Sequence, residues 1–286
     1  MKGVFVFSDT NWSLGRVHRG IQKSLGNEFE FNYLDWATYN WTDFFTLYMW
    51  CDVCVTNLVC LETVRTSFPQ LDLRKCLFVS HGETEHSAVK EYTSYFNYGM
   101  TCECVKHLFP ESVTPFLTPN GVDPDDFIYK QREGSLGNIG WCGGTHVQSK
   151  QINWAYEISA RTDLPIKVAS HFSYEEVKKW YHSIDILIIT SIPEWSSETG
   201  PLPAFEAIVS GIPVIGTPVG NFRSIPGPKF TSIDEAVELV NELKKDEKRM
   251  KLLALEQYEY VMSNFTYDVL SSKWKHALNT VAFQFS

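Results

Sequence analysis

Two glutamates separated by seven residues are the side chains in this sequence with the clearest capacity for chemistry. Glu198 and Glu206 lie in the segment ETGPLPAFEA, which follows an unbroken apolar run over residues 186–189. Such a run is typical of a strand covered on both faces. Glu206 has apolar neighbours, and a carboxylate in a sheet-covering helix is costly to bury unless a partner hydrogen-bonds it. Both carboxylates are therefore candidates to accept hydroxyl groups of a ligand.

The segment between these glutamates predicts a short helix over residues 201–210. Proline is tolerated in a first helical turn, and Gly211 stands where a left-handed C-cap belongs. A second apolar strand begins at Val214, which completes a βαβ unit with a right-handed crossover. Ligands bind at the carboxyl edge of such sheets, and a helix N-terminus favours an anion. Carboxylates for hydroxyl groups and a helix end for phosphate together predict a nucleotide-sugar site.

Further candidates follow other predicted strands. Gly143 and Gly144 would let backbone N–H groups approach a phosphate, and the ammonium group of Lys150 would neutralise it. His81 ends a strand and would offer an imidazole to a sugar or phosphate, whereas His86 on the next helix is expected to be exposed. A surface role would also explain the histidine at the strand end and the lysine in its loop.

Strands and helices alternate along the whole chain, so these candidates would share the carboxyl edges of mainly parallel sheets. In the first half we expect strands at 4–8, 29–34, 52–59, 77–80, 95–101 and 113–117, and helices at 14–25, 42–50, 83–92 and 104–109. In the second half we expect strands at 137–142, 166–169, 186–189 and from 214, and helices at 152–159, 174–182, 201–210, 233–243, 246–263 and 269–281.

The segment from Glu198 to Gly220 resembles the Glu-x7-Glu signature of retaining glycosyltransferases of family 4, because ETGPLPAFEA is followed by SGIPV and GTPVG. The segment TPNGVD at residues 118–123 resembles the element that the family carries where its second domain begins. The resemblance implies the α/β fold GT-B, with two Rossmann-like βα domains facing a cleft. It further implies an acceptor-side domain over 1–118, a nucleotide-sugar-binding domain over 119–265 and a C-terminal helix over 266–286 that crosses back to the first domain.

The resemblance also implies roles for individual residues. Glu198 and His81 would be catalytic, at the transferred hexose, and Glu206 would hold the ribose hydroxyl groups. The other donor-binding positions that it implies are Lys150, Thr199, Gly200, Pro201, Leu202, Gly143, Gly144 and Gly15. The family places an arginine for the diphosphate just after a strand where this chain has Trp141, and Arg223 is one candidate to replace it.

The reaction that the resemblance implies is hexose transfer from a UDP- or GDP-linked donor to a glycan, lipid-linked or small-molecule acceptor. Configuration would be retained, and no metal or other cofactor would be needed. Two alternatives share the architecture: a sugar-nucleotide epimerase or hydrolase, and a catalytically weak nucleotide-sugar-binding protein. The missing arginine at Trp141 is the feature that supports the second alternative.

The composition of the chain and the lengths of its apolar runs indicate which binding partners and which cellular compartment to expect. The net charge is −9, from 34 acidic and 25 basic residues, which argues against a nucleic acid partner. No apolar run reaches the roughly 18–20 residues of a membrane span, and residues 3–7 predict a strand and not a signal segment. We therefore expect a cytoplasmic protein whose seven cysteines are reduced. The oligomeric state is not predicted.

Overall fold

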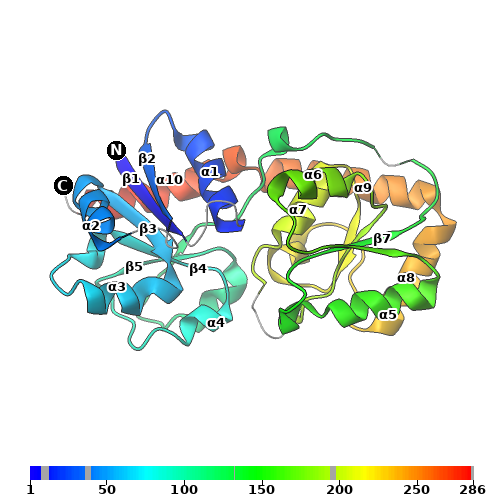
Figure 1. The fold of residues 1–286 in the computed structure, drawn as a ribbon, viewed down its shortest axis with the longest axis horizontal. Coiled ribbons are helices and arrows are strands. Elements are labelled where there is room, and N and C mark those ends of the chain that lie inside the picture. The colour runs from blue at the N-terminus through cyan, green and yellow to red at the C-terminus, as the bar shows by residue number, and fades with distance from the viewer. Residues whose placement is uncertain (8–12, 36–39, 132, 194–197, 285–286) are drawn as a thin grey trace. The chain divides into compact units, whose positions relative to one another are not determined.

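The chain forms two compact α/β units in the computed structural model, which describes residues 1–7, 13–35, 40–131, 133–193 and 198–284 (Figure 1). Unit 1 comprises Met1–Gly121 and Tyr267–Ser286, and unit 2 comprises Val122–Thr266. Each unit contains one parallel sheet, which confirms the α/β prediction.

The sheet of unit 1 has six parallel strands in the order β2-β1-β3-β4-β5-β6. Its central strands are buried along their full length, as in a sheet that helices cover on both faces. The strands are β1 (Lys2–Phe7), β2 (Glu30–Asp35), β3 (Val53–Asn57), β4 (Cys76–Ser80), β5 (Asn97–Met100) and β6 (Phe116–Leu117).

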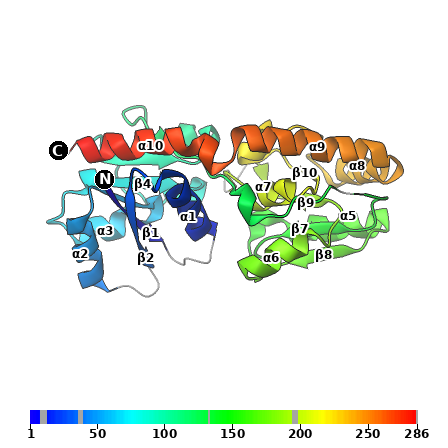
Figure 2. The same cartoon turned by 90° about the horizontal axis from the view of Figure 1, so that it is seen from above.

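Helices cover both faces of this sheet (Figure 2). Helices α1 (Ser13–Leu25) and α10 (Tyr267–Phe283) pack against each other, and α10 also contacts β4 and β6. The contact between α1 and α10 needs Gly20, because a Cβ atom there would lie 2.1 Å from the ring of Tyr267. The other face carries α2 (Trp41–Trp50), α3 (Leu61–Ser67) and the 3₁₀ segment η3 (Glu103–Leu108). The last helix of the chain is thus part of unit 1.

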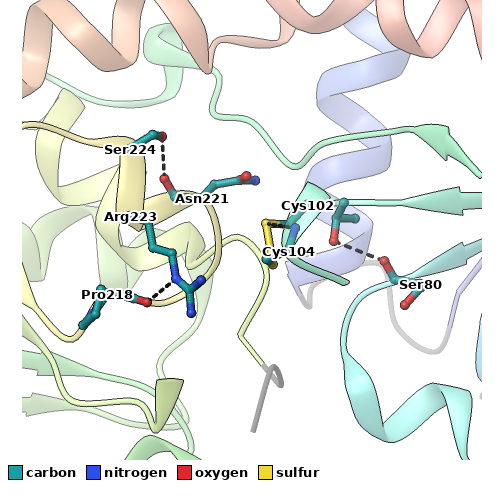
Figure 3. The surroundings of a disulfide bond; sticks show 8 residues. Ser80, Cys102, Cys104, Pro218, Asn221, Arg223 and Ser224 are labelled. Carbon is teal, nitrogen blue, oxygen red and sulfur yellow. Dashed lines mark hydrogen bonds between the residues drawn. A yellow bond between two sulfur atoms is a disulfide. The ribbon is translucent and has the colours of Figure 1, made fainter. Parts of the chain in front are cut away.

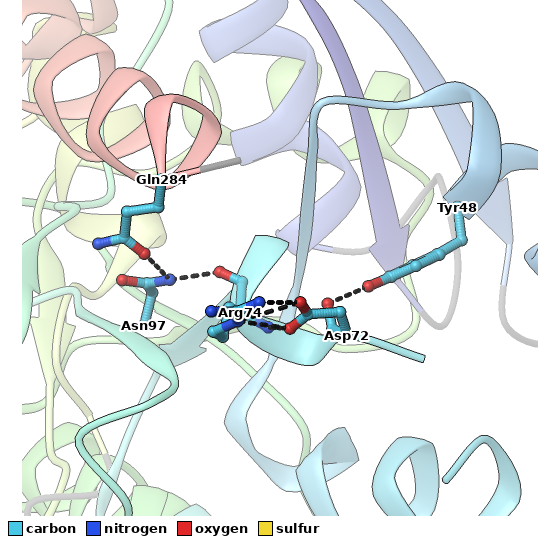
Figure 4. A network of polar contacts seen from close by, with 5 residues as sticks. All are labelled: Tyr48, Asp72, Arg74, Asn97 and Gln284. Carbon is cyan, nitrogen blue, oxygen red and sulfur yellow. Dashed lines mark hydrogen bonds and ion pairs between the residues drawn. The ribbon is translucent and has the colours of Figure 1, made fainter. Parts of the chain in front are cut away.

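Polar side chains tie the amino ends of β4 and β5 to the neighbouring helices (Figure 4). Asn97 Nδ2 donates to Arg74 O and to Gln284 Oε1, which follows α10. The guanidinium group of Arg74 pairs with Asp72, whose carbonyl oxygen accepts from Tyr48 Oη. These bonds lie at the sheet edge opposite to the carboxyl ends.

Three predictions for this part of the chain are wrong. The predicted helix over 83–92 is only α4 (Glu83–His86), because the chain then turns and Tyr92 Oη bonds the ring of His86. Helix α3 follows the 3₁₀ segment η1 (Leu58–Cys60) where no helix was predicted. Cys102 and Cys104 are joined by a disulfide (Figure 3), so not all seven cysteines are reduced. The other five are free thiols, buried or half-buried.

The sheet of unit 2 has four parallel strands in the order β10-β9-β7-β8. The strands are β7 (Ile139–Cys142), β8 (Ile166–Ala169), β9 (Leu187–Ile189) and β10 (Val214–Gly216). The order reverses beside β7, which has β8 on one side and β9 on the other. In open α/β sheets, such a switch point is where ligands bind.

Five helices surround this sheet: α5 (Ile152–Thr162), α6 (Tyr174–Tyr181), α7 (Leu202–Val209), α8 (Ile233–Lys245) and α9 (Glu247–Asn264). Helices α5 and α8 form one apolar layer with the side chains of β7, and α7 packs between the sheet and α9. All residues of α7 except Pro203 are buried, which explains why its sequence is apolar at every position but Glu206. The 3₁₀ segments η4 (Pro124–Asp126), η5 (Gln148–Lys150) and η7 (Gly220–Ser224) lie in the connections.

A buried glutamine on α9 completes the edge of this sheet at β10. Gln257 Oε1 accepts from Val214 N at 2.8 Å, and its Nε2 donates to Val214 O at 2.7 Å and to Pro226 O at 2.9 Å. The side chain therefore occupies the main-chain groups of Val214 that a further strand would otherwise bind. This holds β10, and the chain that follows it, in register with β9.

Candidate active site

An ion pair joins the two loops that leave β7 and β9 at the switch point. Lys150, the last residue of η5, places its Nζ 2.5 Å from Glu198 Oε2, and the two side chains are 25% and 17% exposed. Burial alone disfavours the ammonium group, but the charge and the hydrogen bond of Glu198 outweigh it and raise the pKa of Lys150. Residues 194–197, which precede Glu198, lie outside the described residues.

The main chain at Lys150 is fixed by the strands beneath it. The buried indole of Trp141 donates from Nε1 to Thr190 Oγ1 at 3.0 Å, and Thr190 Oγ1 donates to Lys150 O at 2.7 Å. Ile192 N also donates to Ser149 O at 2.8 Å. These bonds leave the side chain of Lys150 as the part that can change position.

A small pocket lies over this ion pair at the carboxyl ends of β7 and β9. Among the described residues that line it, Lys150 is the one cation and Glu198 the one anion. The lining consists of Trp141, Cys142, Lys150, Ile188, Ile189, Thr190, Ser191, Glu198, Pro201 and Pro203. An anion that enters this pocket therefore meets the ammonium group of Lys150 with a carboxylate already beside it.

The two predicted glycines of the β7 loop lie against Lys150 and the rest of the loop. A Cβ atom at Gly143 would lie 2.8 Å from Lys150 Cδ, so the missing side chain makes room for the lysine stem. Gly143 N donates to Ala169 O at 3.0 Å, and that N–H group already has a partner. Gly144 O accepts from Val147 N at 3.1 Å, which closes the turn leading to η5.

Glu206 lies inside α7 and is only 4% exposed. Its Oε2 accepts from Tyr181 Oη at 2.9 Å, and Tyr181, the last residue of α6, is fully buried. The tyrosine supplies the kind of partner that a buried carboxylate requires. The sequence did not predict Tyr181 as the partner of Glu206, because only the tertiary fold brings residues 181 and 206 together.

The remaining predicted residues form the start of α7. Thr199, Gly200, Pro201 and Leu202 are all buried, and Pro201 at the N-cap has no side-chain acceptor for the first-turn N–H groups. Gly220 has φ +43°, and a Cβ atom there would lie 2.2 Å from Thr199 O and 2.4 Å from Glu198 O. The chain after β10 therefore packs directly on the main chain that carries Glu198.

Arg223 belongs to this same segment, η7, and its side chain is exposed. Its Nε donates to Pro218 O at 2.6 Å, and Ser224 Oγ donates to Asn221 O at 2.9 Å (Figure 3). Asn221 N in turn donates to Thr199 O at 2.8 Å, which ties η7 to the start of α7. The guanidinium group is thus held on the connection that follows β10, at the same edge of the sheet as Glu198.

In unit 1, His81 follows β4 at the carboxyl edge of the sheet. Its backbone N donates to Glu85 Oε2 at 2.8 Å. Burial lowers the pKa of His81 to about 4 and raises that of Glu85 to about 7. His18 on α1, which the sequence did not single out, is buried and stacks on Phe5 with ring centroids 4.2 Å apart. Burial lowers the pKa of His18 as well, so both imidazoles are neutral at pH 7.

The other residues predicted in unit 1 are Gly15 and His86. Gly15 is buried in the first turn of α1, whereas residues 8–12 of the expected ligand loop lie outside the described residues. His86 is not exposed as predicted: its Nε2 lies 2.9 Å from Ser80 Oγ and its Nδ1 lies 2.6 Å from Tyr92 Oη. Burial lowers its pKa to about 4.

Within the described ranges, no three His, Cys, Asp or Glu side chains are grouped closely enough to hold a metal ion. No helix among the described residues has the length and apolar character to cross a membrane.

Comparison with known proteins identifies the relatives of unit 2. The family model for group 1 glycosyl transferases matches residues 142–259, which include Lys150, Glu198 and Glu206. No curated protein sequence matches the chain. The family match supports a glycosyltransferase and lies wholly within unit 2.

Solved structures resemble the whole chain at low sequence identity. HepE from Anabaena, in complex with UDP-glucose, has a TM-score of 0.70 at 11% identity and covers 98% of this chain and 100% of its own. The catalytic domain of starch synthase IV from Arabidopsis thaliana, bound to ADP and acarbose, has a TM-score of 0.67 at 12% identity, with 99% of each chain covered. These similarities confirm the GT-B fold.

A third structure is longer than this protein. It is a mutant of TarM from S. aureus in complex with fondaparinux, alpha-GlcNAc-glycerol and UDP, with a TM-score of 0.61 at 12% identity. The match covers 82% of this chain but only 58% of the TarM chain. The chain therefore spans little more than half of the length of TarM.

Proposed function

We propose that this protein is a retaining glycosyltransferase that resembles family 4 and moves a hexose from a nucleoside diphosphate sugar to an acceptor. The observation that supports it most is the Lys150–Glu198 pair at the switch point, with Glu206 buried on the helix that follows. The match to group 1 glycosyl transferases spans the three residues. Neighbours bound to UDP, UDP-glucose and ADP favour a nucleoside diphosphate donor, and we propose a UDP- or GDP-linked one.

In this proposal the residues of unit 2 divide the donor between them. Lys150 binds the diphosphate, Glu198 orients the hexose, and Glu206 accepts the ribose hydroxyl groups. The N–H groups at the start of α7 add a partial positive charge for the phosphates. The acceptor is a glycan, a lipid-linked sugar or a small molecule, and the neutral imidazole of His81 in unit 1 hydrogen-bonds substrate hydroxyl groups.

The proposed reaction is a front-face substitution. The bond from the anomeric carbon to the diphosphate breaks as the acceptor oxygen bonds to that carbon, and the leaving diphosphate takes the acceptor proton. Stabilising the negative charge on the diphosphate is then the largest catalytic contribution. Lys150 and the start of α7 supply positive charge there, and Arg223 on η7 is the candidate for the second cation. We therefore propose catalysis without a divalent metal or other cofactor.

A thermal-shift screen against UDP, GDP, ADP and TDP tests donor binding first. A nucleotide at 100 times its dissociation constant adds about 2.7 kcal/mol to the free energy of unfolding, which raises the melting temperature measurably. The corresponding sugar nucleotides are then incubated with an acceptor panel, and NMR gives the anomeric configuration of the product. We expect the configuration of the donor, with full activity in EDTA. An inverted product, or activity that EDTA abolishes and magnesium restores, would contradict the proposal.

One observation favours a second candidate, a nucleotide-sugar-binding protein with weak catalysis. The position where the family has an arginine is Trp141, and its indole is buried and bonded to Thr190, so it cannot bind the diphosphate. Tight nucleotide binding with no product on any acceptor would support this candidate. An epimerase or hydrolase would instead convert the sugar nucleotide when no acceptor is present.

A further inference from the structure

Lys150 is the cation that the proposed donor site offers to phosphate, and Glu198 already forms an ion pair with it. The two charged atoms are 2.5 Å apart, and both side chains are mostly buried. Because the main chain at Lys150 is fixed through Thr190 and Ser149, the loop cannot carry the ammonium group away. A diphosphate can reach Lys150 only if the lysine side chain turns from Glu198 or shares its three donors with both anions.

Glu198 loses its partner when this exchange takes place. A partly buried carboxylate without a counter-charge or a hydrogen-bond donor is costly. A nucleotide sugar brings hexose hydroxyl groups that can donate to Glu198. A bare nucleoside diphosphate has no hexose, and in the proposed site its ribose hydroxyl groups bind Glu206 instead. The ion pair therefore weakens binding of the bare nucleoside diphosphate more than binding of the nucleotide sugar.

We propose that Glu198 acts as an internal competitor for Lys150, so that the site binds a nucleoside diphosphate carrying a sugar in preference to the bare nucleoside diphosphate. This inference rests on the proposed function, because it takes the pocket as the donor site. It assigns the ion pair a role after transfer: Lys150 returns to Glu198 and the bare nucleoside diphosphate leaves. Glu198 thereby sets specificity and product release as well as orienting the hexose.

The variant that tests the competition is Glu198→Gln, which keeps the shape of the side chain and removes its charge. We expect bare UDP, GDP, ADP or TDP, whichever binds the wild type, to bind this variant about 3- to 10-fold more tightly. The glucose conjugate of the same nucleotide should gain less or lose affinity, because Glu198 no longer accepts its hydroxyl groups. Isothermal titration of the full chain gives both dissociation constants.

Loss of simple repulsion between Glu198 and phosphate would also tighten binding, so the substitution is repeated in a Lys150→Met background. If Glu198 acts by holding Lys150, the gain falls below about twofold there, and the double-mutant cycle shows the coupling. An equal gain in both backgrounds would overturn the competition. Glu175→Gln is the matched control, because it removes a carboxylate from an ion pair with Lys178 on the surface of α6. It should change neither dissociation constant.

The outcomes separate this inference from the proposed function. If the wild type binds one of the four nucleotides and Glu198→Gln does not tighten it, the competition is wrong and the donor site stands. If none of the four nucleotides binds the wild type, the donor site and the inference both fail. Glu198→Ala provides a second variant if the glutamine variant does not fold.

Discussion

The carboxyl edges of the two sheets hold opposite kinds of polar groups. In unit 2 the edge carries a charged pair, Lys150 and Glu198, and the pKa of the lysine is raised by its partner. In unit 1 the edge carries His81, with His18 on α1 beside it, and burial lowers the pKa of both imidazoles so that they are neutral at pH 7. Glu198 thus preserves the charge of Lys150 against the effect of burial, whereas burial removes the charge from the histidines.

This difference indicates which part of a substrate suits each edge. A diphosphate is an ion, and it needs a site that keeps a cation in place against the cost of burial. Sugar hydroxyl groups are neutral, and they hydrogen-bond well to neutral imidazoles. The contrast supports the proposal that unit 2 binds the donor diphosphate and that His81 binds uncharged hydroxyl groups. The following predictions test this contrast, beginning with the largest effect.

The largest effect is expected at Glu198. We predict that Glu198→Gln lowers kcat by about 10²-fold or more, as for the loss of one preorganised electrostatic group. Glu206→Gln should instead raise KM and weaken binding of the bare nucleoside diphosphate, because the proposed role of Glu206 is at the ribose, which does not change in the reaction. Steady-state kinetics and titration calorimetry separate the two. If Glu198→Gln lost nucleotide binding while Glu206→Gln kept it, the roles would be reversed.

The next effect concerns the cation of unit 2. Lys150→Met should weaken binding of the nucleoside diphosphate by about 10- to 100-fold, since it removes one charge-assisted hydrogen bond. The matched control is Lys178→Met, because Lys178 also pairs with a glutamate but lies on α6, outside the pocket. Titration calorimetry measures both. Unchanged affinity in Lys150→Met would remove the phosphate site from this edge of the sheet.

A smaller effect is expected from the partner of Glu206. Tyr181→Phe removes the hydroxyl group that donates to Glu206 Oε2, which should lower the free energy of unfolding by about 1 kcal/mol. It should also raise KM for the donor several-fold, with kcat little changed. Tyr174→Phe on the same helix removes a bond to the exposed Asp126 and serves as the control. A purely structural role for Tyr181 predicts the stability loss without the change in KM.

The smallest effect is expected in how the free energy of unfolding depends on pH through the titratable groups of unit 1. The pKa of Glu85 is raised by burial from 4.5 to about 7, so the folded state binds more protons than the unfolded state between these values. The contribution of Glu85 to stability is therefore complete below pH 4.5 and is lost as the pH rises through about 7. Glu85→Gln cannot ionise and should gain stability relative to the wild type over this range. Denaturant unfolding at pH 4.5 and pH 8 measures the difference.

The histidines change the stability with pH in the opposite direction to Glu85. His81 and His86 have pKa values lowered by burial from 6.5 to about 4, so their contribution is complete above pH 6.5 and is lost as the pH falls toward 4. His81→Gln should flatten the acid side of the stability profile. An unchanged acid slope in this variant would show that His81 does not titrate as a buried imidazole.

The elements of unit 2 could be predicted from the sequence because their signals are local. Apolar runs gave β9 and β10, and Gly211 with φ +86° ends the segment of α7 as the C-cap pattern predicted. Glu198, Glu206 and Lys150 were found because a charged residue stands out beside apolar neighbours or glycines. The structure brings Lys150 and Glu198 together, although 48 positions separate them in the chain.

The supporting residues could not be predicted, because their roles arise from tertiary packing. Tyr181 and Thr190 look like ordinary ends of a helix and a strand, and only the fold shows which groups they bond. Trp141 was noted as a missing arginine, whereas the structure shows it supporting the loop of Lys150 through Thr190. In unit 1, the short α4 and the half-buried His86 accompany a bond to Tyr92 that no local pattern encodes.

The most direct test of the account is a transfer assay followed by mass spectrometry. Wild type and Glu198→Gln are incubated side by side with the sugar nucleotides of UDP, GDP, ADP and TDP and a panel of glycan, lipid-linked and small-molecule acceptors. The account predicts an acceptor product carrying one added hexose in the wild type, formed at least about 10²-fold more slowly by the variant. Equal rates in the two proteins, or a nucleotide sugar that binds tightly and is never transferred, would contradict it.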